Sequence, residues 1–264
     1  SDWLPVVSAS KVREPAHRAF PKEAEDWDIE RIIKDYADAA IRMKDANMDG
    51  IEIEAYGHFL DSFWSPATNF RQDEYGGSID NRIKFSIRVI EAIRKEVGKE
   101  FIVGVRMVAD EDWDQGLSKE EGLQIVKKII DTNKVDFLNI IRGHIDTDAA
   151  LSKVIPTQGM RSNPHLDFAG DIKFNTSFPI FHASKINDVA TARHAIESGK
   201  LDMVGMTRAH IADPHIVKKI IDNKESEIRP CVGATYCLDR IYEGNEALCI
   251  HNPATGREKF MPHK

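Results

Sequence analysis

Three polar side chains, Glu54, Tyr56 and His58, occupy alternating positions where the apolar run Gly50–Ile53 ends. A carboxylate, a phenol and an imidazole are groups that act as general acids and bases. They open a long polar loop over residues 54–80. In a barrel of alternating strands and helices, catalytic side chains lie at the C-terminal ends of the strands. The segment therefore predicts an active site in which these three residues carry protons.

Two later apolar runs also end in charged residues. Arg106 lies near the end of the run Phe101–Met107. Its side chain either extends from the core to solvent or stabilises an anionic group of a ligand. The run Phe137–Ile141 is followed by Arg142, His144 and Asp146, which are expected to form the opposite wall of the site. Of these, His144 is the best additional proton carrier.

Two segments rich in small residues, His182–Ile186 and Gly205–Ala209, follow the last two apolar runs. Small residues at a strand end allow backbone amides to approach a ligand closely. A phosphate bound there would contact those amides, Arg208 and the N-terminus of a nearby helix. Their order along the chain matches the phosphate site that follows the last two strands of a (β/α)8 barrel.

Short β-branched runs alternate with longer amphipathic segments along the chain. The five predicted strands are Gly50–Ile53, Phe101–Met107, Phe137–Ile141, Phe178–His182 and Met203–Met206. They are predominantly apolar rather than alternating, as parallel strands covered on both faces are. Helices are predicted at about Asp28–Ala46, at Ile83–Val97, after the capping box Ser118–Glu121, and from Asn187-Asp188 and Asp213-Pro214. The pattern predicts a parallel α/β fold.

The number of strands leaves two architectures open. A closed (β/α)8 barrel needs eight strands and about 250 residues. The chain shows five strands and a weak sixth candidate at Leu4–Ser8. It is therefore predicted to be either a TIM barrel without its first strands or a complete five-stranded doubly wound sheet.

Composition narrows the class of protein. The chain has 264 residues, a hydrophobic content of 42% and a charged content of 30%, which are ordinary for a globular protein. A formal net charge of −7 and the lack of a basic tract argue against nucleic-acid binding. No apolar run approaches the roughly 20 residues that span a bilayer. The N-terminus does not resemble a signal peptide, and the 3 cysteines do not suggest a disulfide framework, so a cytoplasmic protein is expected.

Several motifs in this order resemble those of the flavin-dependent Old Yellow Enzyme superfamily. They are Asp49-Gly-Ile-Glu-Ile, Leu60-Asp-Ser-Phe, Ser65-Pro-Ala-Thr-Asn69, Asp73-Glu-Tyr-Gly-Gly-Ser-Ile-Asp-Asn-Arg82, Val103-Gly-Val-Arg106, Ala212-Asp-Pro214 and Ile228-Arg-Pro-Cys231. The resemblance implies an FMN-binding TIM barrel of which this chain holds strands four to eight. It implies a partial barrel over residues 1–225 and a cysteine-containing segment over residues 226–264.

The resemblance also assigns cofactor contacts. It implies that Arg106 contacts the flavin ring system. It implies that residues of the two small-residue segments surround the FMN phosphate, namely Ala183, Ser184, Lys185, Gly205, Thr207 and Arg208.

The cysteines Cys231, Cys237 and Cys249 resemble the iron–sulfur segment of trimethylamine dehydrogenase and dienoyl-CoA reductase. The second ligand position of that segment is Ala234 here. Because a [4Fe–4S] cluster ordinarily needs four thiolates, the outcomes left open are a lost cluster, a three-iron [3Fe–4S] cluster, or a fourth ligand from elsewhere. Three inert cysteines remain an equal alternative.

The strand end selects a branch of the superfamily. Ene-reductases carry His-x-x-His or His-x-x-Asn there, and Glu54-Ala-Tyr-Gly-His58 lacks that pair. Tyr56 and His58 resemble the branch of trimethylamine dehydrogenase and the N-methylproline and dimethylglycine demethylases. The resemblance implies FMN-dependent oxidative demethylation of a small N-methylated amine or amino acid. Glu54 would neutralise the substrate cation, and Trp64 either faces that cation or packs within its loop.

Two alternatives to the demethylase remain. One is an NAD(P)H-dependent ene-reductase that acts on enones or 2,4-dienoyl-CoA esters. The other, from a different class, is a non-catalytic fragment or partner subunit. A homo-oligomer or a part of a longer polypeptide is expected, with an unidentified electron acceptor.

Overall fold

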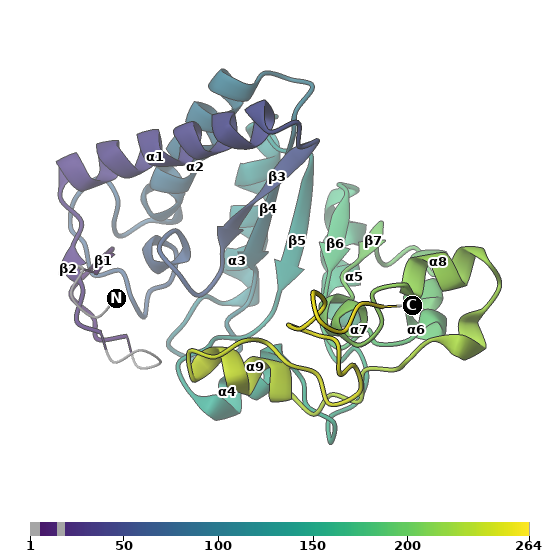
Figure 1. Ribbon diagram of the computed structural model, residues 1–264. Coiled ribbons are helices and arrows are strands. Elements are labelled where there is room, and N and C mark those ends of the chain that lie inside the picture. The colour runs from purple at the N-terminus through teal and green to yellow at the C-terminus, as the bar shows by residue number, and fades with distance from the viewer. Residues whose placement is uncertain (1–5, 15–18, 264) are drawn as a thin grey trace. The chain divides into compact units, whose positions relative to one another are not determined.

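A computed structural model describes residues 6–14 and 19–263 of the chain (Figure 1). The chain divides into two compact units. The first consists of Ser1–Val154 with Ile172–Phe181, and the second of Ile155–Asp171 with His182–Lys264. Among the described residues, no helix combines the length and the apolar character that crossing a membrane requires.

The first unit is built on a parallel sheet whose strands follow one another in sequence order. Strand β3 (Gly50–Ala55) pairs with β4 (Ile102–Val108), and β4 pairs with β5 (Phe137–Ile141), both in parallel. The peptide N–H of Leu138 donates to the Pro179 carbonyl (3.0 Å), which places the entry of β6 (Ile180–His182) beside β5. The predicted strand bounds agree to within two residues here.

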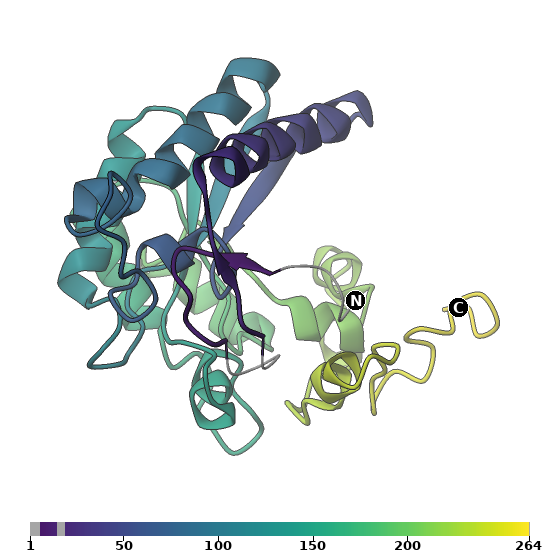
Figure 2. The same cartoon turned by 90° about the vertical axis from the view of Figure 1, so that its left-hand side faces the viewer.

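Three helices cover one face of these strands. Helix α1 (Asp26–Asp45) packs on α2 (Ile79–Val97), and α2 packs on α3 (Lys119–Asp131). Figures 1 and 2 show all three on the same side of β3, β4 and β5. Where parallel strands follow one another in sequence order, right-handed crossovers place every connecting helix on the same side of the sheet, as in (β/α) barrels. In a doubly wound sheet the order of the strands reverses, and helices cover both faces. The first unit therefore follows the barrel-type arrangement, although its strands form an open sheet.

Side-chain alternation explains which groups this sheet offers for chemistry. Ile53, Val105 and Leu138 are at most 4% exposed. Glu54 and Arg106 alternate with these residues and therefore point to the face opposite the helices. The predicted capping box begins α3, where the Ser118 hydroxyl accepts from the Glu121 N–H and the Glu121 carboxylate accepts from the Ser118 N–H.

A short N-terminal element lies outside this sheet. Strand β1 (Val7–Ser8) pairs in parallel with β2 (Lys22–Glu23). The weak strand candidate Leu4–Ser8 is thus present at Val7–Ser8, while Leu4 and Pro5 lie outside the described residues. A 3₁₀ turn η1 (Asp61–Phe63) and helix α4 (Asp148–Val154) complete the described part of the first unit.

The regular elements of the second unit are mostly helices, joined by long loops. Helix α5 (Leu166–Thr176) and strand β6 each contribute residues to both units. The remaining elements are α6 (Val189–Glu197), β7 (Met203–Val204), α7 (Thr207–Ala212), α8 (Ile216–Ile221), η2 (Glu225–Glu227) and α9 (Tyr236–Tyr242). The Asp188 carboxylate caps α6 by accepting from the Thr191 N–H (2.8 Å), as Asn187-Asp188 predicts.

Candidate active site

The C-terminal ends of β3, β4 and β5 meet at one edge of the sheet because the strands are parallel and in register. The ladder continues past the strands, since the Ala109 N–H donates to the Ile141 carbonyl (3.0 Å) and the Gly143 N–H to the Asp110 carbonyl (2.7 Å). The loops after the three strands therefore lie side by side. This edge carries Glu54, Tyr56, His58 and His144, which the sequence predicts as proton carriers.

A tight turn after β3 presents His58. The buried Asp61 carboxylate accepts hydrogen bonds from the backbone N–H groups of Gly57 and His58, the latter at 2.9 Å. Gly57 has φ +68°, a conformation that favours glycine. The His58 side chain is exposed, whereas Tyr56 is only 8% exposed. The turn thus separates the two predicted proton carriers: His58 is open to solvent and the Tyr56 ring is buried.

Glu54 and Arg106 form the charged pair of this edge. They occupy the same register row of β3 and β4, and Glu54 Oε2 lies 3.6 Å from Arg106 Nη1. Burial raises the pKa of the Glu54 carboxyl, while the charges of Arg106 and His58 oppose that shift. Among the described residues, neither Arg106 Nε nor Glu54 Oε1 has a hydrogen-bond partner, and both atoms are buried. Buried polar atoms of this kind usually have partners, so this pair fits a ligand that supplies polar groups.

A second buried carboxylate, Glu111, joins two of the loops. It accepts from the Ser65 hydroxyl (2.6 Å) in the loop after β3 and from the Leu117 N–H in the loop after β4. Burial raises the pKa of Glu111, and the nearby charges of Asp61 and Asp146 raise it further.

The loop after β5 presents His144 on an aromatic support. The rings of His144 and Trp113 stack with centroids 4.8 Å apart and planes at 21°. The Asp146 N–H lies 3.3 Å from His144 Nδ1. Burial also raises the pKa of Asp146, against the opposing charge of His144. This strand edge is therefore rich in carboxyl groups, and it also carries His58 and His144. The carboxyl groups are those of Glu54, Asp61, Glu111 and Asp146.

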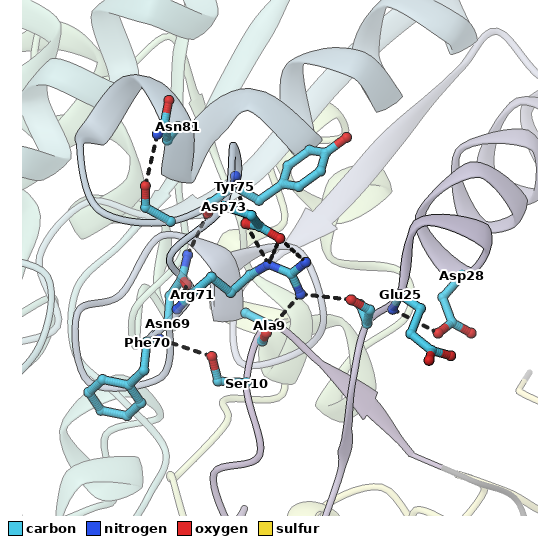
Figure 3. Close-up of polar contacts among 12 residues, drawn as sticks. Ala9, Ser10, Glu25, Asp28, Asn69, Phe70, Arg71, Asp73, Tyr75 and Asn81 are labelled. Carbon is cyan, nitrogen blue, oxygen red and sulfur yellow. Dashed lines mark hydrogen bonds and ion pairs between the residues drawn. The ribbon is translucent and has the colours of Figure 1, made fainter.

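Arg71 anchors the long loop after β3 to the N-terminal segment (Figure 3). Its guanidinium donates to the carbonyl oxygens of Ala9 (3.2 Å) and Ala24 (2.7 Å) and to the Asp73 carboxylate. Asn69 braces the same loop internally, because its side-chain amide donates to the carbonyls of Phe63 and Tyr75. The two contacts of Arg71 with the N-terminal segment join residues 62 and 47 positions apart, whereas the others are local.

Trp64 belongs to the interior of this loop. It is fully buried, and its indole N–H donates to the Ser86 hydroxyl of α2 at 2.9 Å. Of the two roles left open for Trp64, the structure supports packing, since a fully buried ring has no face available to a substrate cation.

The residues expected around a phosphate lie in the second unit. The Ser184 side chain is buried, and its hydroxyl has no hydrogen-bond partner among the described residues. Lys185 Nζ donates to backbone carbonyls, including that of Thr157 (2.7 Å), and Arg208 Nη1 donates to the Pro156 carbonyl (2.9 Å). A Cβ on Gly205 would lie 2.5 Å from that of Ala183, so the segments after β6 and β7 approach closely. Thr207 begins α7.

These observations bear on whether FMN fits the chain. Arg106 in the first unit and Ser184 in the second each hold a buried polar atom that lacks a partner within the described residues. A guanidinium and a hydroxyl suit the carbonyl edge and the phosphate of a flavin nucleotide. Each of these predicted contacts is chemically suited to FMN.

The three cysteines line one cavity of the second unit, together with Ala234, Arg208 and His251. Burial raises the pKa of Cys237, against the opposing charge of Arg208. The described residues contain no group of three or more His, Cys, Asp or Glu placed to hold a metal ion. With Ala234 at the second ligand position, the donor set does not fit a cluster held by four thiolates.

Sequence reasoning missed Asp61 and Glu111. Asp61 is the charged residue of the segment Phe59–Phe63 and lies three positions after His58. That spacing is typical of a carboxylate that caps a turn. Glu111 gives no comparable local signal, because its partner Ser65 lies 46 residues away.

The amino-acid sequence is similar to those of a known family of flavin-dependent enzymes and of two curated proteins. Residues 5–227 match the model of the NADH:flavin oxidoreductase / NADH oxidase family. The chain is 65% identical over 262 residues to a probable N-methylproline demethylase of Rhizobium meliloti (strain 1021), a match that covers 99% of this chain and 39% of that protein. It is 47% identical over 262 residues to a multifunctional alkene reductase/demethylase OYE of Caballeronia cordobensis, covering 99% of this chain and 38% of that protein.

A solved structure agrees with the fold. The 2-naphthoyl-CoA reductase complex with 2-naphthoyl-CoA matches at a TM-score of 0.89 and 28% identity, covering 96% of this chain and 38% of that one. The chain thus spans less than two fifths of each of these two curated relatives and of this solved structure.

Proposed function

Because this chain belongs to the NADH:flavin oxidoreductase / NADH oxidase family, we propose that it is part of an FMN-dependent enzyme that oxidatively demethylates a small N-methylated amine or amino acid. The similarity to a probable N-methylproline demethylase supports this choice of substrate class. So does the strand end Glu54-Ala-Tyr-Gly-His58, which lacks the histidine pair of an ene-reductase.

The acidic strand edge is the observation that carries the proposal. Four carboxyl groups lie at this strand edge, Glu54, Asp61, Glu111 and Asp146, and burial raises the pKa of each. Two of them, Glu54 and Asp61, interact with the charge of the exposed His58. Carboxylates placed in this way favour a cationic ligand, which a methylated ammonium is before it loses a proton. A nearby imidazole can take that proton, and the neutral amine is the form from which hydride can leave.

The chain's own residues divide the remaining work. Glu54 faces the substrate cation, His58 accepts its proton, and His144 and Tyr56 complete the proton-carrying set. Arg106 would hold the flavin ring, and Ala183, Ser184, Lys185, Gly205, Thr207 and Arg208 would hold the FMN phosphate. When bound, FMN supplies a two-electron acceptor for the hydride that leaves the N-methyl carbon. The substrate nitrogen lone pair then forms a C=N bond, and water adds to that carbon and releases formaldehyde and the demethylated amine.

The proposal extends to architecture and setting. Strands β3 to β7 would be the fourth to eighth strands of an FMN-linked (β/α)8 barrel whose first three strands lie outside this chain. The barrel part would end near residue 225, and residues 226–264 would form a separate cysteine-containing segment, with Cys231, Cys237 and Cys249 as its candidate metal ligands. We also place the protein in the cytoplasm, as a homo-oligomer or part of a longer polypeptide, without nucleic-acid or membrane partners.

An ene-reductase is the second candidate, because a relative at 47% identity is named as both an alkene reductase and a demethylase. Anaerobic titration of the polypeptide that contains this chain separates the two. N-methylproline or dimethylglycine should bleach its flavin absorbance and release formaldehyde. The demethylase proposal would be overturned if NADPH bleached the flavin and an enone turned over, while no amine bleached it. A polypeptide that binds no flavin would support the non-catalytic alternative.

A further inference from the structure

The turn after β3 is fixed by a small set of short-range contacts. Both oxygens of the Asp61 carboxylate are used, one by the Gly57 N–H and one by the His58 N–H. Gly57 also packs under the loop after β5, since a Cβ at this position would lie 2.7 Å from Ile145 Cδ1. The turn therefore has little room to move while Asp61 remains ionised.

The same turn determines which ring nitrogen of His58 carries a proton. His58 Nδ1 lies 2.6 Å from the Gly57 carbonyl oxygen. A carbonyl oxygen only accepts hydrogen bonds, so Nδ1 must be the donor. In the neutral ring the lone pair is then on Nε2, the outer nitrogen of an exposed side chain.

We propose that Asp61 is a positioning residue, which holds the Gly57–His58 turn so that His58 presents the Nε2 lone pair as the proton acceptor of this site. The inference rests on the proposed function for the identity of the proton donor, an N-methylated ammonium. The orientation of His58 and its tautomer do not depend on that function.

His144 has the opposite arrangement, which separates the roles of the two histidines. Its Nδ1 accepts from the Asp146 N–H, so the proton of the neutral ring is on Nε2. The stack on Trp113 fixes the plane of the ring. His58 thus presents a lone pair at Nε2, whereas the neutral ring of His144 carries its proton at Nε2.

Acidification should release the turn. Asp61 faces the charge of His58 on its own loop, that of Glu111 in the loop after β4, and Tyr36 of α1. Burial raises the pKa of Asp61 to about 6, against the hydrogen bonds from His58 and Gly57. Once protonated, the carboxyl has one oxygen that donates, and it no longer accepts from both N–H groups.

Long-range proton–nitrogen NMR of the ¹⁵N-histidine-labelled polypeptide that contains this chain tests the proposal. Neutral rings protonated on Nδ1 and on Nε2 give different patterns, and His58→Gln identifies the His58 signal. We expect the Nδ1–H form for His58 in the parent protein at pH 8, and a mixture of both forms in Asp61→Asn. The Nε2–H form in the parent protein would overturn the proposal even if Asp61→Asn failed to fold.

Kinetics supply the second readout. Flavin reduction by saturating amine should slow about tenfold in Asp61→Asn with little change in KM, because the base is misplaced while the substrate still binds. In the parent protein, the rate of flavin reduction should fall below about pH 6, where Asp61 becomes protonated. The pH profile of Asp61→Asn should lack this fall. If no amine reduces the parent flavin, the proposed function fails while the NMR result still decides the role of Asp61.

Asp213→Asn is the matched control. Asp213 is an equally buried carboxylate that accepts from the backbone N–H groups of His215 (3.1 Å) and Arg229 (2.8 Å) in the second unit. The Asp213→Asn variant should leave the His58 tautomer and the pH profile of flavin reduction unchanged. Equal effects of the two variants on both readouts would assign Asp61 a general structural role and overturn the proposal.

Discussion

Glu54 and Arg106 face each other across neighbouring strands, with Oε2 of the carboxylate 3.6 Å from Nη1 of the guanidinium. Both side chains are about two fifths exposed, at 40% and 38%, so the pair remains accessible to a ligand. A pair of this exposure contributes little to folding, about 1 kcal/mol at most. Its effect should therefore be measured on binding.

Glu54→Gln should raise KM for a cationic amine about tenfold, equivalent to about 1.4 kcal/mol, because one substrate-facing charge is lost. The measurement is steady-state kinetics at pH 8 in the polypeptide that contains this chain. Glu52→Gln is the control, since Glu52 points to the same face of β3 two positions earlier. Equal increases in KM for both variants would show that the position of the charge is unimportant.

Asp61 should make folding stability fall as pH rises. Its folded pKa of about 6 exceeds the ordinary value of 3.8, so the folded state holds a proton that the unfolded state releases between these pH values. The stabilisation is complete below about pH 4 and is lost as pH rises through 6, a change of about 3 kcal/mol. Asp61→Asn should remove this dependence in urea unfolding at pH 4.5 and 7.5.

Asp213→Asn should change stability with the opposite sign when urea unfolding is compared at pH 2.5 and 4.5, on either side of the ordinary carboxyl pKa of 3.8. Burial opposes the shift, but Lys219 and the Arg229 N–H together lower the pKa of Asp213. The stabilisation from Asp213 is therefore present at neutral pH and is lost as pH falls through its lowered pKa. The same trend in both variants would contradict the assigned shifts.

Arg71→Met should destabilise the polypeptide by about 3–5 kcal/mol, because it leaves the carbonyls of Ala9 and Ala24 and the Asp73 carboxylate without their buried donor. Chemical denaturation checks this. Arg31→Met removes an exposed ion pair with Asp35 on α1 and should cost no more than about 0.5 kcal/mol. A small effect at Arg71 would mean that water replaces the guanidinium.

Gly122→Ala should lower the melting temperature although alanine is the better helix former by about 1 kcal/mol. A Cβ at this position of α3 would lie 1.9 Å from the Ala109 carbonyl oxygen, so the helix must move away from β4. Gly159→Ala is the control, because no atom lies within 4 Å of its added Cβ. An unchanged or higher melting temperature for Gly122→Ala would show that the helix shifts at no cost.

Ala234→Cys should increase the iron and acid-labile sulfide bound after anaerobic reconstitution. Ala234 lines the same cavity as Cys231, Cys237 and Cys249, and the variant completes a set of four thiols. The parent polypeptide is the reference, and Ala234→Ser controls for the change in size. Equal iron in all three would mean that this cavity does not hold the cluster.

The sequence predicted the elements whose signals are local. Phe137–Ile141 has the predicted bounds, and the Ser118–Glu121 capping box begins α3 as expected, since both signals lie within a few residues. The predicted strand Met203–Met206 is only Met203–Val204, because Met206 already caps α7. The helix expected from Asp213-Pro214 begins later, at Ile216.

The site was predictable in part. Glu54, Tyr56, His58 and His144 were found at strand ends, where apolar runs stop. The anchors that position them were not, because Arg71 and Glu111 act on residues more than 40 positions away. Their hydrogen bonds depend on how loops fold back, which periodicity does not encode. The burial of Tyr56 could not be predicted from the sequence either, because it depends on how side chains pack around the turn.

The Gly57–Asp61 turn has a consequence for how this strand end can diversify. All of the hydrogen bonds that shape it join residues at most four positions apart. The hydrogen bonds of the turn are therefore local, and substitutions at positions 56 and 58 leave in place the bonds from the backbone N–H groups of residues 57 and 58 to Asp61. A relative named for both alkene reduction and demethylation shows that the two chemistries coexist in one family. A combinatorial library at these two positions alone is thus a practical route for redirecting such an enzyme from one reaction to the other.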